Sequence, residues 1–547
     1  MTDGLSRRDL LKGIGAVGGA AAIGGLPRIG QAAGAPVAGK LGDIEHIIIS
    51  IQENRAFDHY FGTYRGVRGF DDRSVRQPDG SSIFAQKGYP SGPGGRLLPF
   101  HIDTNKGGDC TPDVDHGWPA QHASYDGGRN DRWVPTHIAS NGAAVGPSVM
   151  GYYTRADLPY YHALADNFTI CDHYHCSVIG PTDPNHLYNF SGTLDPEGKH
   201  GGPQLSTDLK EGHPYAFTWT TMPERLQAAG VSWKLYTSPD SNAINNVLYY
   251  FKNYETDPNL IRGAFGNTNW PADFAADVAA GTLPQVSWIL SPAVEEEHPA
   301  SPITLGEFFT SQVIDILTSN PAVYAKSVLI LTYDENGGFF DHVPPPAPPP
   351  GTPGEYLTGT LPAAAGGFRG PVGLGFRVPT IIVSPFSRGG FVASDVFDHT
   401  STLLLVEKRF GVEAPNLSKW RRETVGDMTS ALNFCAPDAS IPTLPAVNPA
   451  DPRVTSESCL TDGQPYPVPA QMTMPTQEPG KAKRPSGICE EPRARTLTIT
   501  PASFTSTGTA LPGGAVVAGA GLLAGGVLAA ERALRRRKNE AVTKPGR

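Results

Sequence analysis

Basic charge is scarce in this chain of 547 residues. Lysine and arginine total 44 against 53 aspartate and glutamate residues, charged residues make up only 18% of the sequence, and the formal net charge is -9. A nucleic-acid-binding protein presents a basic surface to the phosphate backbone. The balance therefore argues against nucleic acid as a partner.

Cysteine is also rare, and the few that occur follow no zinc-ligand spacing. They are widely and irregularly spaced along the chain, at Cys110, Cys171, Cys176, Cys435, Cys459 and Cys489. An even number of cysteines in an exported protein is typical of disulfide pairing. We expect one to three disulfides, and the sequence leaves their pairing open.

The first 38 residues are typical of an export signal. Arg7 and Arg8 precede a weakly apolar run rich in glycine and alanine, which leads into small residues suited to cleavage. This pattern predicts a twin-arginine signal peptide over residues 1–38, read by the twin-arginine export machinery, which usually delivers a protein already folded. The alternative is a cytosolic amphipathic helix that happens to hold two arginines.

The C-terminal end predicts a membrane anchor. Residues 511–530, LPGGAVVAGAGLLAGGVLAA, are long enough to cross a bilayer, and the basic sequence ERALRRRK after them marks the cytoplasmic side. We therefore expect a transmembrane segment at 511–530, a basic cytoplasmic tail at 531–547, and the rest of the protein at the extracellular face of the membrane. The alternative is a sorting signal that is trimmed during attachment to the cell wall.

Between these ends the sequence divides into a body and an extension. Over residues 42–437, short apolar runs alternate with amphipathic helical stretches, which predicts an α/β domain with a central mostly parallel sheet flanked by helices on both faces. Glycine (63) and proline (52) are numerous enough to predict long ordered loops. Residues 438–510 are rich in proline, threonine and serine, which predicts a small cysteine-pinned extension followed by a stalk.

Acidic and amide side chains follow two of the predicted strands directly. IEHIIISIQ runs into Glu53 and Asn54, and SVLILTY runs into Asp334 and Glu335. Ligands bind at the carboxyl ends of the strands in parallel sheets. Oxygen ligands without cysteine suit a hard or borderline divalent cation, and the sequence does not select among Ca, Mg, Mn, Fe and Zn.

A third polar cluster surrounds a threonine. In DHYHCSVIGPTDPNHLYNFSG, Thr182 lies between Pro181 and Pro184, and the stretch around it contains three histidines, two aspartates and two asparagines. A tight turn explains the prolines but not the polar residues. A threonine hydroxyl is almost wholly protonated at neutral pH, and metal coordination would lower its pKa enough to make it a nucleophile. We therefore expect Thr182 at the metal.

Three further residues are candidates for contact with a phosphate group. Asn185 could donate to a phosphate oxygen, while His116 and His298 could stabilise the transferred group or protonate the leaving group. Taken singly, each of these motifs is more typical of a loop, a cap or a core position than of a site. Asp341 and His342, in FFDHV, are expected either to orient ligands or to cap a turn.

The motifs together resemble one known family. They include ENRAFDHYFGTYRGVRGF, GPTDPNHLY, EEEHPASP, YDENGGFFDHVPPPAPPPGTPGEY, GLGFRVPTIIVSPFSRGGFV and FDHTS, in this order. Over roughly residues 42–437 the chain resembles the bacterial phosphoesterase family that contains the non-haemolytic-type phospholipases C and a group of acid phosphatases. The resemblance implies an alkaline-phosphatase-like α/β sandwich with one divalent metal ion, whose identity it leaves unknown.

The resemblance also implies roles for individual residues. The implied metal ligands are Glu53, Asn54, Thr182, Asp334 and Glu335. Thr182 would in addition be the nucleophile. The implied substrate contacts and remaining catalytic residues are His116, Asn185 and His298.

Two features resemble the phospholipase branch of that family, namely threonine at the nucleophile position and the sequences VPPPAPPPGTPGEY and WRRETVGDMTSALNF. They imply hydrolysis of phosphatidylcholine-like phospholipids to diacylglycerol and a phosphorylated head group through a phosphoryl-enzyme. The alternatives are an acid phosphatase acting on phosphomonoesters and a surface-displayed binding protein that has lost catalysis. Aromatic residues at 152–161 and 339–340 are expected either to line an apolar mouth or to lie in the core. The short extension, in place of the β-rich C-terminal domains of the large relatives, argues against haemolytic action.

Overall fold

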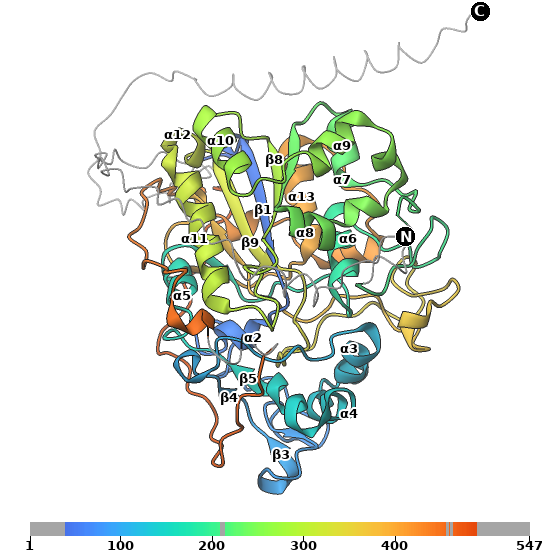
Figure 1. The fold of residues 1–547 in the computed structure, drawn as a ribbon, viewed down its shortest axis with the longest axis vertical. Coiled ribbons are helices and arrows are strands. Elements are labelled where there is room, and N and C mark those ends of the chain that lie inside the picture. The colour runs from blue at the N-terminus through green and yellow to red at the C-terminus, as the bar shows by residue number, and fades with distance from the viewer. Residues whose placement is uncertain (1–38, 208–213, 456–458, 460–462, 490–547) are drawn as a thin grey trace, which may run out of the picture. The chain divides into compact units, whose positions relative to one another are not determined.

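A computed structural model describes residues 39–207, 214–455, 459 and 463–489 (Figure 1). The predicted signal peptide, the predicted membrane segment and the predicted cytoplasmic tail lie outside these residues, as does the end of the extension from 490 to 510. Among the described residues, no helix is long and apolar enough to cross a membrane.

A seven-stranded sheet forms the centre of the protein, in the order β11-β6-β10-β9-β1-β8-β7. Its strands are β1 (His46–Gln52), β6 (Thr169–Cys171), β7 (Trp233–Tyr236), β8 (Val286–Leu290), β9 (Ser327–Tyr333), β10 (Ile381–Val383) and β11 (Phe391–Ala393). Only β10 runs antiparallel to its neighbours, and the other pairs are parallel. The predicted mostly parallel sheet is therefore confirmed. Two small sheets pair β2 (Gln86–Lys87) with β3 (Arg96–Leu97) and β4 (Phe100–His101) with β5 (Gly151–Tyr152).

Helices cover both faces of the central sheet, as predicted. They are α2 (Phe57–Phe61), α3 (Trp118–Tyr125), α4 (Trp133–Val145), α5 (Pro159–Asn167), α6 (Thr182–Ser191), α7 (Met222–Ala228), α8 (Pro239–Ile244), α9 (Pro258–Phe265), α10 (Ala272–Ala280), α11 (Ile303–Ser319), α12 (Pro321–Tyr324), α13 (His399–Phe410) and α14 (Lys419–Thr424). In Figure 1, α10 and α11 lie on one side of β1, whereas α6 and α13 lie on the other.

The two central strands fix the position of the predicted ligands. Every residue of β9 is buried, and so is all of β1 after His46, which is expected for parallel strands that are covered on both faces. Gln52 pairs with Tyr333 at the ends of these strands. The next residues of the two strands therefore leave the sheet side by side at its carboxyl edge. The segment containing α2, α3, α4 and the two small sheets lies beyond that edge (Figure 1).

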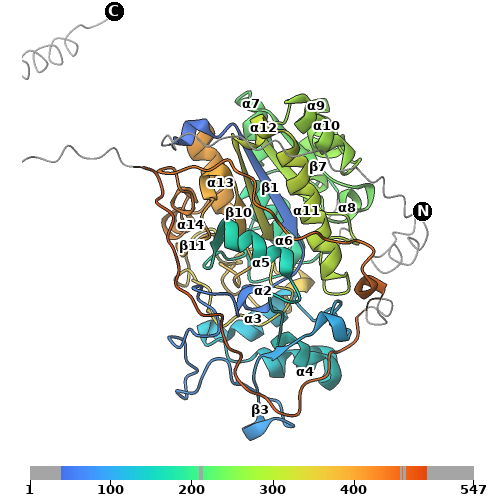
Figure 2. The ribbon, with the colours of Figure 1, turned by 90° about the vertical axis from the view of Figure 1, so that its left-hand side faces the viewer.

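The C-terminal extension is fastened to the body by covalent and polar contacts. Disulfides join Cys110 to Cys459 and Cys435 to Cys489, while Cys171 and Cys176 are free and buried. The pairing that the sequence left open thus comprises two bonds, within the expected range. The extension follows the outside of the body as an orange segment in Figure 2.

Candidate active site

The predicted ligand pairs meet at the carboxyl edge of the sheet. The Asp334 backbone N–H donates to the carbonyl of Gln52 at 2.9 Å, and the Asn54 N–H donates to Asp334 Oδ1 at 2.8 Å. Asn54 adopts a φ of +64°, a left-handed conformation that asparagine tolerates better than most residues. A side chain at Gly337 would place its Cβ 2.3 Å from the Asn54 carbonyl oxygen, so the glycine in the DENGG sequence makes room for this turn.

The predicted ligands Glu53, Asn54, Asp334 and Glu335 are all buried, and within the described part of the chain three of them hold an oxygen atom that lacks a hydrogen-bond partner. The unpartnered atoms are Asn54 Oδ1, Asp334 Oδ2 and Glu335 Oε1. Burial raises the pKa of Asp334 well above its usual range, and the charges of Glu53 and Glu335 raise it further. Burial also raises the pKa of Glu335, to about 7. Carboxylates gathered in this way need a positive charge between them, so the residues fit a divalent cation.

Thr182 joins this cluster from the opposite side. It is the first residue of α6, directly after Pro181, and its Oγ1 lies 3.5 Å from Glu53 Oε2. The structure thus brings together the predicted nucleophile and the predicted ligand set. The hydroxyl lies at the positive end of the α6 dipole, which favours negative charge at this point.

His186 is a member of the cluster that sequence reasoning missed. Its Nε2 lies 3.1 Å from Glu53 Oε1, and both side chains are buried. Potential ligand atoms of Glu53, His186 and Asp334 all lie within 4.8 Å of one another. The spacing offered a usable signal, because residues four apart share a helix face and His186 follows Thr182 by four positions on α6.

Asn185 braces the loop that presents Thr182. Its Oδ1 accepts a hydrogen bond from the Val178 N–H at 2.9 Å, and its Nδ2 donates to the carbonyls of Gly180 and Pro181 at 3.1 and 3.0 Å. The side chain therefore fixes the turn before α6. Its contact with a substrate phosphate stays a prediction.

The two predicted histidines lie near each other at the edge of the cluster. The His116 and His298 ring centroids are 5.9 Å apart. His116 Nδ1 lies 2.8 Å from the Val114 carbonyl oxygen, and its Nε2 lies 3.2 Å from Asn54 Nδ2. A neutral imidazole satisfies both contacts if Nδ1–H donates to Val114 and Nε2 accepts from Asn54. Both rings lie near the Asp113 carboxylate, since His116 Nδ1 is 3.4 Å and His298 Nε2 is 3.9 Å from its Oδ1.

A buried arginine connects the loops that carry these histidines. Arg55 directly follows the ligand pair, and its Nε donates to the Glu297 carbonyl at 2.8 Å, next to His298. Its Nη1 donates to Thr111 Oγ1 at 3.4 Å, and the Thr111 N–H donates to the Pro299 carbonyl at 2.8 Å. No periodicity in the sequence points to this role, because the partners are far apart along the chain.

The Glu297 side chain anchors the same loop in the core. Its carboxylate accepts hydrogen bonds from the hydroxyls of Tyr60, Tyr161 and Tyr333, the last at 2.8 Å. Burial raises the pKa of Glu297. A Cβ at Gly306 would lie 2.0 Å from this carboxyl group, so glycine is required there. The loop that carries His298 is therefore held by both its backbone and a buried side chain.

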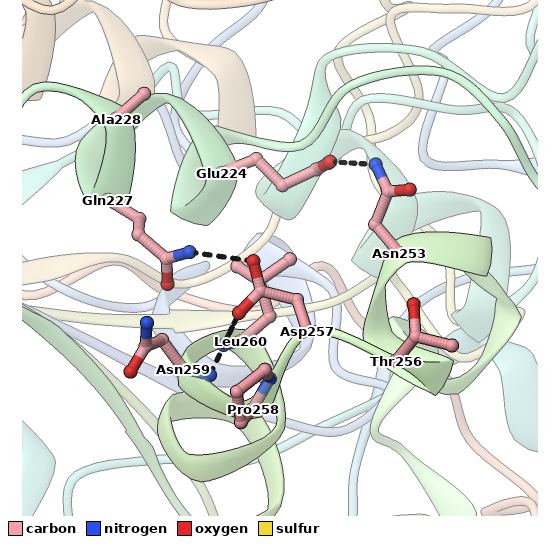
Figure 3. Close-up of a pocket in the computed structure, with 9 residues that line it drawn as sticks. All are labelled: Glu224, Gln227, Ala228, Asn253, Thr256, Asp257, Pro258, Asn259 and Leu260. Carbon is pink, nitrogen blue, oxygen red and sulfur yellow. Dashed lines mark hydrogen bonds between the residues drawn. The ribbon is translucent and has the colours of Figure 1, made fainter.

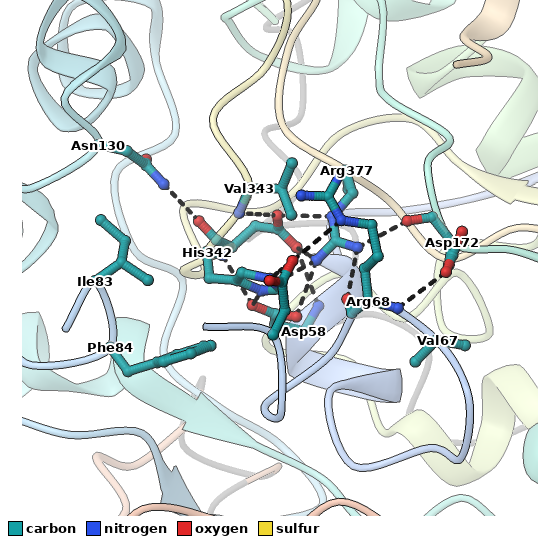
Figure 4. A network of polar contacts seen from close by, with 12 residues as sticks. Asp58, Val67, Arg68, Ile83, Phe84, Asn130, Asp172, His342, Val343 and Arg377 are labelled. Carbon is teal, nitrogen blue, oxygen red and sulfur yellow. Dashed lines mark hydrogen bonds and ion pairs between the residues drawn. The ribbon is translucent and has the colours of Figure 1, made fainter. Parts of the chain in front are cut away.

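A second buried polar network lies around Arg377 and includes Asp341 and His342 (Figure 4). Arg377 donates to Asp341 Oδ1 at 2.9 Å and to Asp58 Oδ1 at 3.0 Å, and His342 Nδ1 lies 2.6 Å from Asp58 Oδ2. Burial alone would lower the pKa of His342, but the Asp58 carboxylate raises it. The guanidinium already neutralises these carboxylates. Asp341 and His342 therefore tie loops together inside the protein.

The larger of two pockets lies away from the predicted residues. It has a volume of about 670 Å³ between α7 and α9 and is lined by polar residues such as Glu224 and Asp257, which cap those helices (Figure 3). A pocket of about 410 Å³ is instead lined by Asp113, His116 and Pro181. The smaller pocket is the one that adjoins the candidate site.

The aromatic segments that could have formed an apolar mouth belong largely to the core. Tyr153, Tyr160, Tyr161, Phe339 and Phe340 are all buried. Their rings pack in the core, and the Tyr161 hydroxyl also donates to Glu297. Of the two alternatives expected for these segments, the structure supports the core.

The sequence of the chain is similar to those of known proteins over most of its length. The Phosphoesterase family matches residues 44–413 of the chain. "Phospholipase C B" of Mycobacterium tuberculosis is 45% identical over 521 residues, covering 89% of this chain and 99% of that protein. "Non-hemolytic phospholipase C" of Pseudomonas aeruginosa is 43% identical over 505 residues, covering 87% of this chain and 70% of that protein.

Among solved structures, the lipoteichoic acid synthase LtaP from Listeria monocytogenes matches with a TM-score of 0.31 and 11% sequence identity, over 73% of this chain and 78% of that one. A protein in the alkaline phosphatase superfamily from Vibrio parahaemolyticus matches with the same TM-score and 10% identity, over 72% of each chain. The family resemblance expected from the motifs is confirmed by the sequence relatives.

Proposed function

The chain belongs to the phosphoesterase family, and from that starting point we propose that it is a metal-dependent phospholipase C acting on phosphatidylcholine-like lipids. Its relatives and family identify it as a phosphoric diester hydrolase. The observation that carries the finer proposal is that the Thr182 hydroxyl lies 3.5 Å from Glu53 Oε2. Glu53 belongs to the same cluster as Asn54, Asp334 and Glu335, each of which holds a buried oxygen atom without a hydrogen-bond partner among the described residues. The relatives named phospholipase C supply the class of substrate.

The ligand set supports the use of one divalent cation. Glu53, Asn54, Asp334 and Glu335 would hold it, with Thr182 completing the set and His186 either ligating or orienting Glu53. When bound, such a cation would lower the pKa of the threonine hydroxyl and offset the negative charge of the phosphodiester.

The bond-forming and bond-breaking steps involve Thr182 and water. Once its hydroxyl has released its proton to solvent, Thr182 Oγ1 bonds to phosphorus as the bond from phosphorus to the glycerol oxygen breaks. The glycerol oxygen takes a proton and leaves as diacylglycerol. Water then attacks phosphorus, releases the phosphorylated head group and returns a proton to Thr182.

His298 is better placed than His116 to protonate the leaving oxygen. The contacts of His116 with Asn54 and Val114 suit a neutral ring whose Nε2 accepts a hydrogen bond. Asp113 Oδ1 lies 3.9 Å from His298 Nε2 and 3.4 Å from His116 Nδ1, so this carboxylate does not distinguish the two rings, and the assignment rests on the contacts of His116. We therefore assign His298 as the general acid and His116 as a residue that orients Asn54.

The test compares a lipid diester with a soluble monoester. The purified chain should release diacylglycerol from phosphatidylcholine faster than it cleaves p-nitrophenyl phosphate. Thr182→Ala should lower turnover by about a thousandfold or more, whereas Thr182→Ser, which retains a hydroxyl, should keep measurable activity. Removal of metal by a chelator should abolish turnover, and addition of a divalent cation should restore it.

Other outcomes would favour the alternatives. Fast monoester cleavage without a lipid product would make the protein an acid phosphatase. Lack of turnover on both substrates with every metal tested would favour a binding protein, although the complete ligand set argues against that function. Full activity of Thr182→Ala would exclude Thr182 as the nucleophile.

We also propose that the protein is exported by the twin-arginine route and held at the cell surface. The support is the sequence at residues 1–38 and 511–530, outside the described residues. Replacing Arg7 and Arg8 by lysine should retain the protein in the cytoplasm, as measured by cell fractionation.

A further inference from the structure

Three large hydrophobic side chains are conspicuously exposed on the described part of the chain. They are Phe368 (46%), Ile441 (36%) and Ile488 (49%). Single exposed apolar residues are common on soluble proteins, so exposure alone indicates nothing. Their surroundings differ, however. Ile441 and Ile488 belong to the C-terminal extension, whereas Phe368 belongs to a loop next to the pocket that adjoins the candidate site.

Direct contacts connect this loop to that pocket. Ala364, in the short 3-10 helix η8 (Ala363–Ala365), lines the pocket together with His116 and Pro181. Trp118, two residues after His116, donates from Nε1 to the Phe368 carbonyl at 3.2 Å. A Cβ at Gly366, whose φ is +54°, would lie 2.7 Å from Pro119. The loop is therefore seated on the first turn of α3, beside the opening.

The loop also lacks exposed charge. Over residues 343–368, VPPPAPPPGTPGEYLTGTLPAAAGGF, the single charged residue is Glu355, which is buried and pairs with Arg421 at 2.9 Å. From 361 to 368 the chain consists of apolar residues and glycine, and most of them are at least partly exposed. Runs of exposed apolar residues are avoided on soluble proteins unless they serve a function.

A basic residue ends the uncharged run. Arg369 is exposed, and its Nη1 donates to the carbonyls of Leu357 and Gly359 at 3.1 and 3.0 Å. The guanidinium is therefore held beside the apolar tip. An exposed aromatic ring next to an arginine suits the boundary between acyl chains and phosphate head groups, because the ring enters the apolar layer while the cation stays with the phosphates.

We infer that the loop at 361–369 docks the protein on a phospholipid surface and brings a lipid head group to the adjoining pocket. The inference rests on the proposed phospholipase function, because that function requires access to lipids packed in a surface. Phe368 is the residue that enters the lipid layer. The loop contains no acidic residue, and its one exposed cation, Arg369, suits the phosphate groups of a phosphatidylcholine surface.

The experiment measures hydrolysis of phosphatidylcholine in two physical forms. Vesicles of long-chain phosphatidylcholine present a surface, whereas monomeric short-chain phosphatidylcholine in solution does not. Phe368→Ala in the full chain should lower the rate on vesicles about tenfold, as expected for loss of one inserted aromatic side chain, and leave the rate on the monomeric lipid within about twofold of wild type. Ile441→Ala and Ile488→Ala are matched controls that should change neither rate.

A binding measurement separates this inference from the proposed catalysis. Phe368→Trp, combined with Thr182→Ala to prevent turnover, should gain a blue-shifted fluorescence signal on phosphatidylcholine vesicles relative to Thr182→Ala alone. If wild type cleaves neither lipid form, the proposed function fails, and the fluorescence still decides whether the loop binds a lipid surface.

Three results would overturn the inference. The first is an unchanged vesicle rate in Phe368→Ala, the second is an equal loss on vesicles and monomers, and the third is the absence of a fluorescence shift. An equal loss in all three exposed-residue variants would also contradict it, because the effect would then not belong to this loop.

Discussion

The Nε2 atom of His186 lies 3.1 Å from Oε1 of Glu53, inside the cluster that gathers the predicted metal ligands. Glu53 lies at the end of β1, whereas His186 lies one turn into α6. This contact therefore couples the helix that carries Thr182 to the edge of the sheet. The contact also gives a role to His186, which the sequence left without one.

Replacement of His186 by alanine should weaken metal binding. Partners of metal ligands typically contribute about 10–100-fold to affinity, because they orient the ligand and set its basicity. The protein is first stripped of metal with a chelator. The recovery of activity during titration with a divalent cation then measures the change in metal affinity. His200→Ala is the control, since His200 is exposed. An unchanged metal affinity would show that His186 only fills space.

Arg55→Lys should lower kcat while leaving metal affinity intact. Lysine keeps the charge but cannot donate to both the Glu297 carbonyl and Thr111, so the loops of His298 and His116 lose their common support. A misplacement of catalytic groups by about 1 Å costs up to about a hundredfold in rate. Steady-state kinetics and metal titration are measured on the same preparation.

The matched control for Arg55 is Arg225→Lys, at an exposed position of α7. Thermal unfolding of both variants shows whether the fold is retained. A parallel fall in kcat and in metal affinity would contradict the assignment of Arg55 to the loops, and so would a normal kcat.

The contribution of Glu307 to the stability of the fold should decrease as the pH rises. Burial raises its pKa from 4.5 to about 8, although the backbone N–H groups of Tyr160 and Tyr161 donate to the carboxyl group and act in the opposite direction. The folded state then binds the proton more tightly than the unfolded state. Its contribution to stability is greatest below about pH 4.5 and falls toward pH 8, by at most about 1.4 kcal/mol per pH unit.

Glu307→Gln removes this titration. Chemical unfolding at pH 5 and pH 8 should therefore show that wild type loses more stability over this interval than the variant does. Glu423→Gln, at an exposed position, should behave like wild type. Identical pH dependence in wild type and Glu307→Gln would mean that the carboxyl group titrates normally in the folded protein.

The two disulfides should contribute unequally to stability. Cys110 and Cys459 are 349 residues apart, whereas Cys435 and Cys489 are 54 apart. Removing a native disulfide typically costs about 2–5 kcal/mol. On the chain-entropy account the longer loop contributes about 1.7 kcal/mol more, from 1.5RT ln(349/54). Denaturant unfolding of the two double-serine variants measures the difference, and equal losses would argue against the entropic account.

Much of the framework could be predicted because it depends on local patterns. The predicted strands at IEHIIISIQ and SVLILTY coincide with β1 and β9, whose apolar runs are those of strands buried on both faces. Residues directly after β1 and β9 then had to meet, since neighbouring parallel strands end at the same edge.

The supporting contacts could not be predicted in this way. Arg55 and Glu297 lie 242 positions apart, and neither belongs to a repeating pattern. Their arrangement depends on a left-handed backbone at Glu297, on the room left by Gly306, and on three tyrosines from separate elements. Such buried polar groups are recognised only when the packing around them is known.

The bond between Cys110 and Cys459 has a consequence for how the protein is made. It begins beside Thr111, in the loop that leads to His116, and ends at a residue that the ribosome adds long after all the predicted ligands. A chain cut short before residue 459 would contain every residue of the candidate site and lack this covalent tie to its histidine loop. The site is therefore synthesised before the disulfide that ties its histidine loop can form, because that bond requires a chain extending at least to residue 459 and an oxidant.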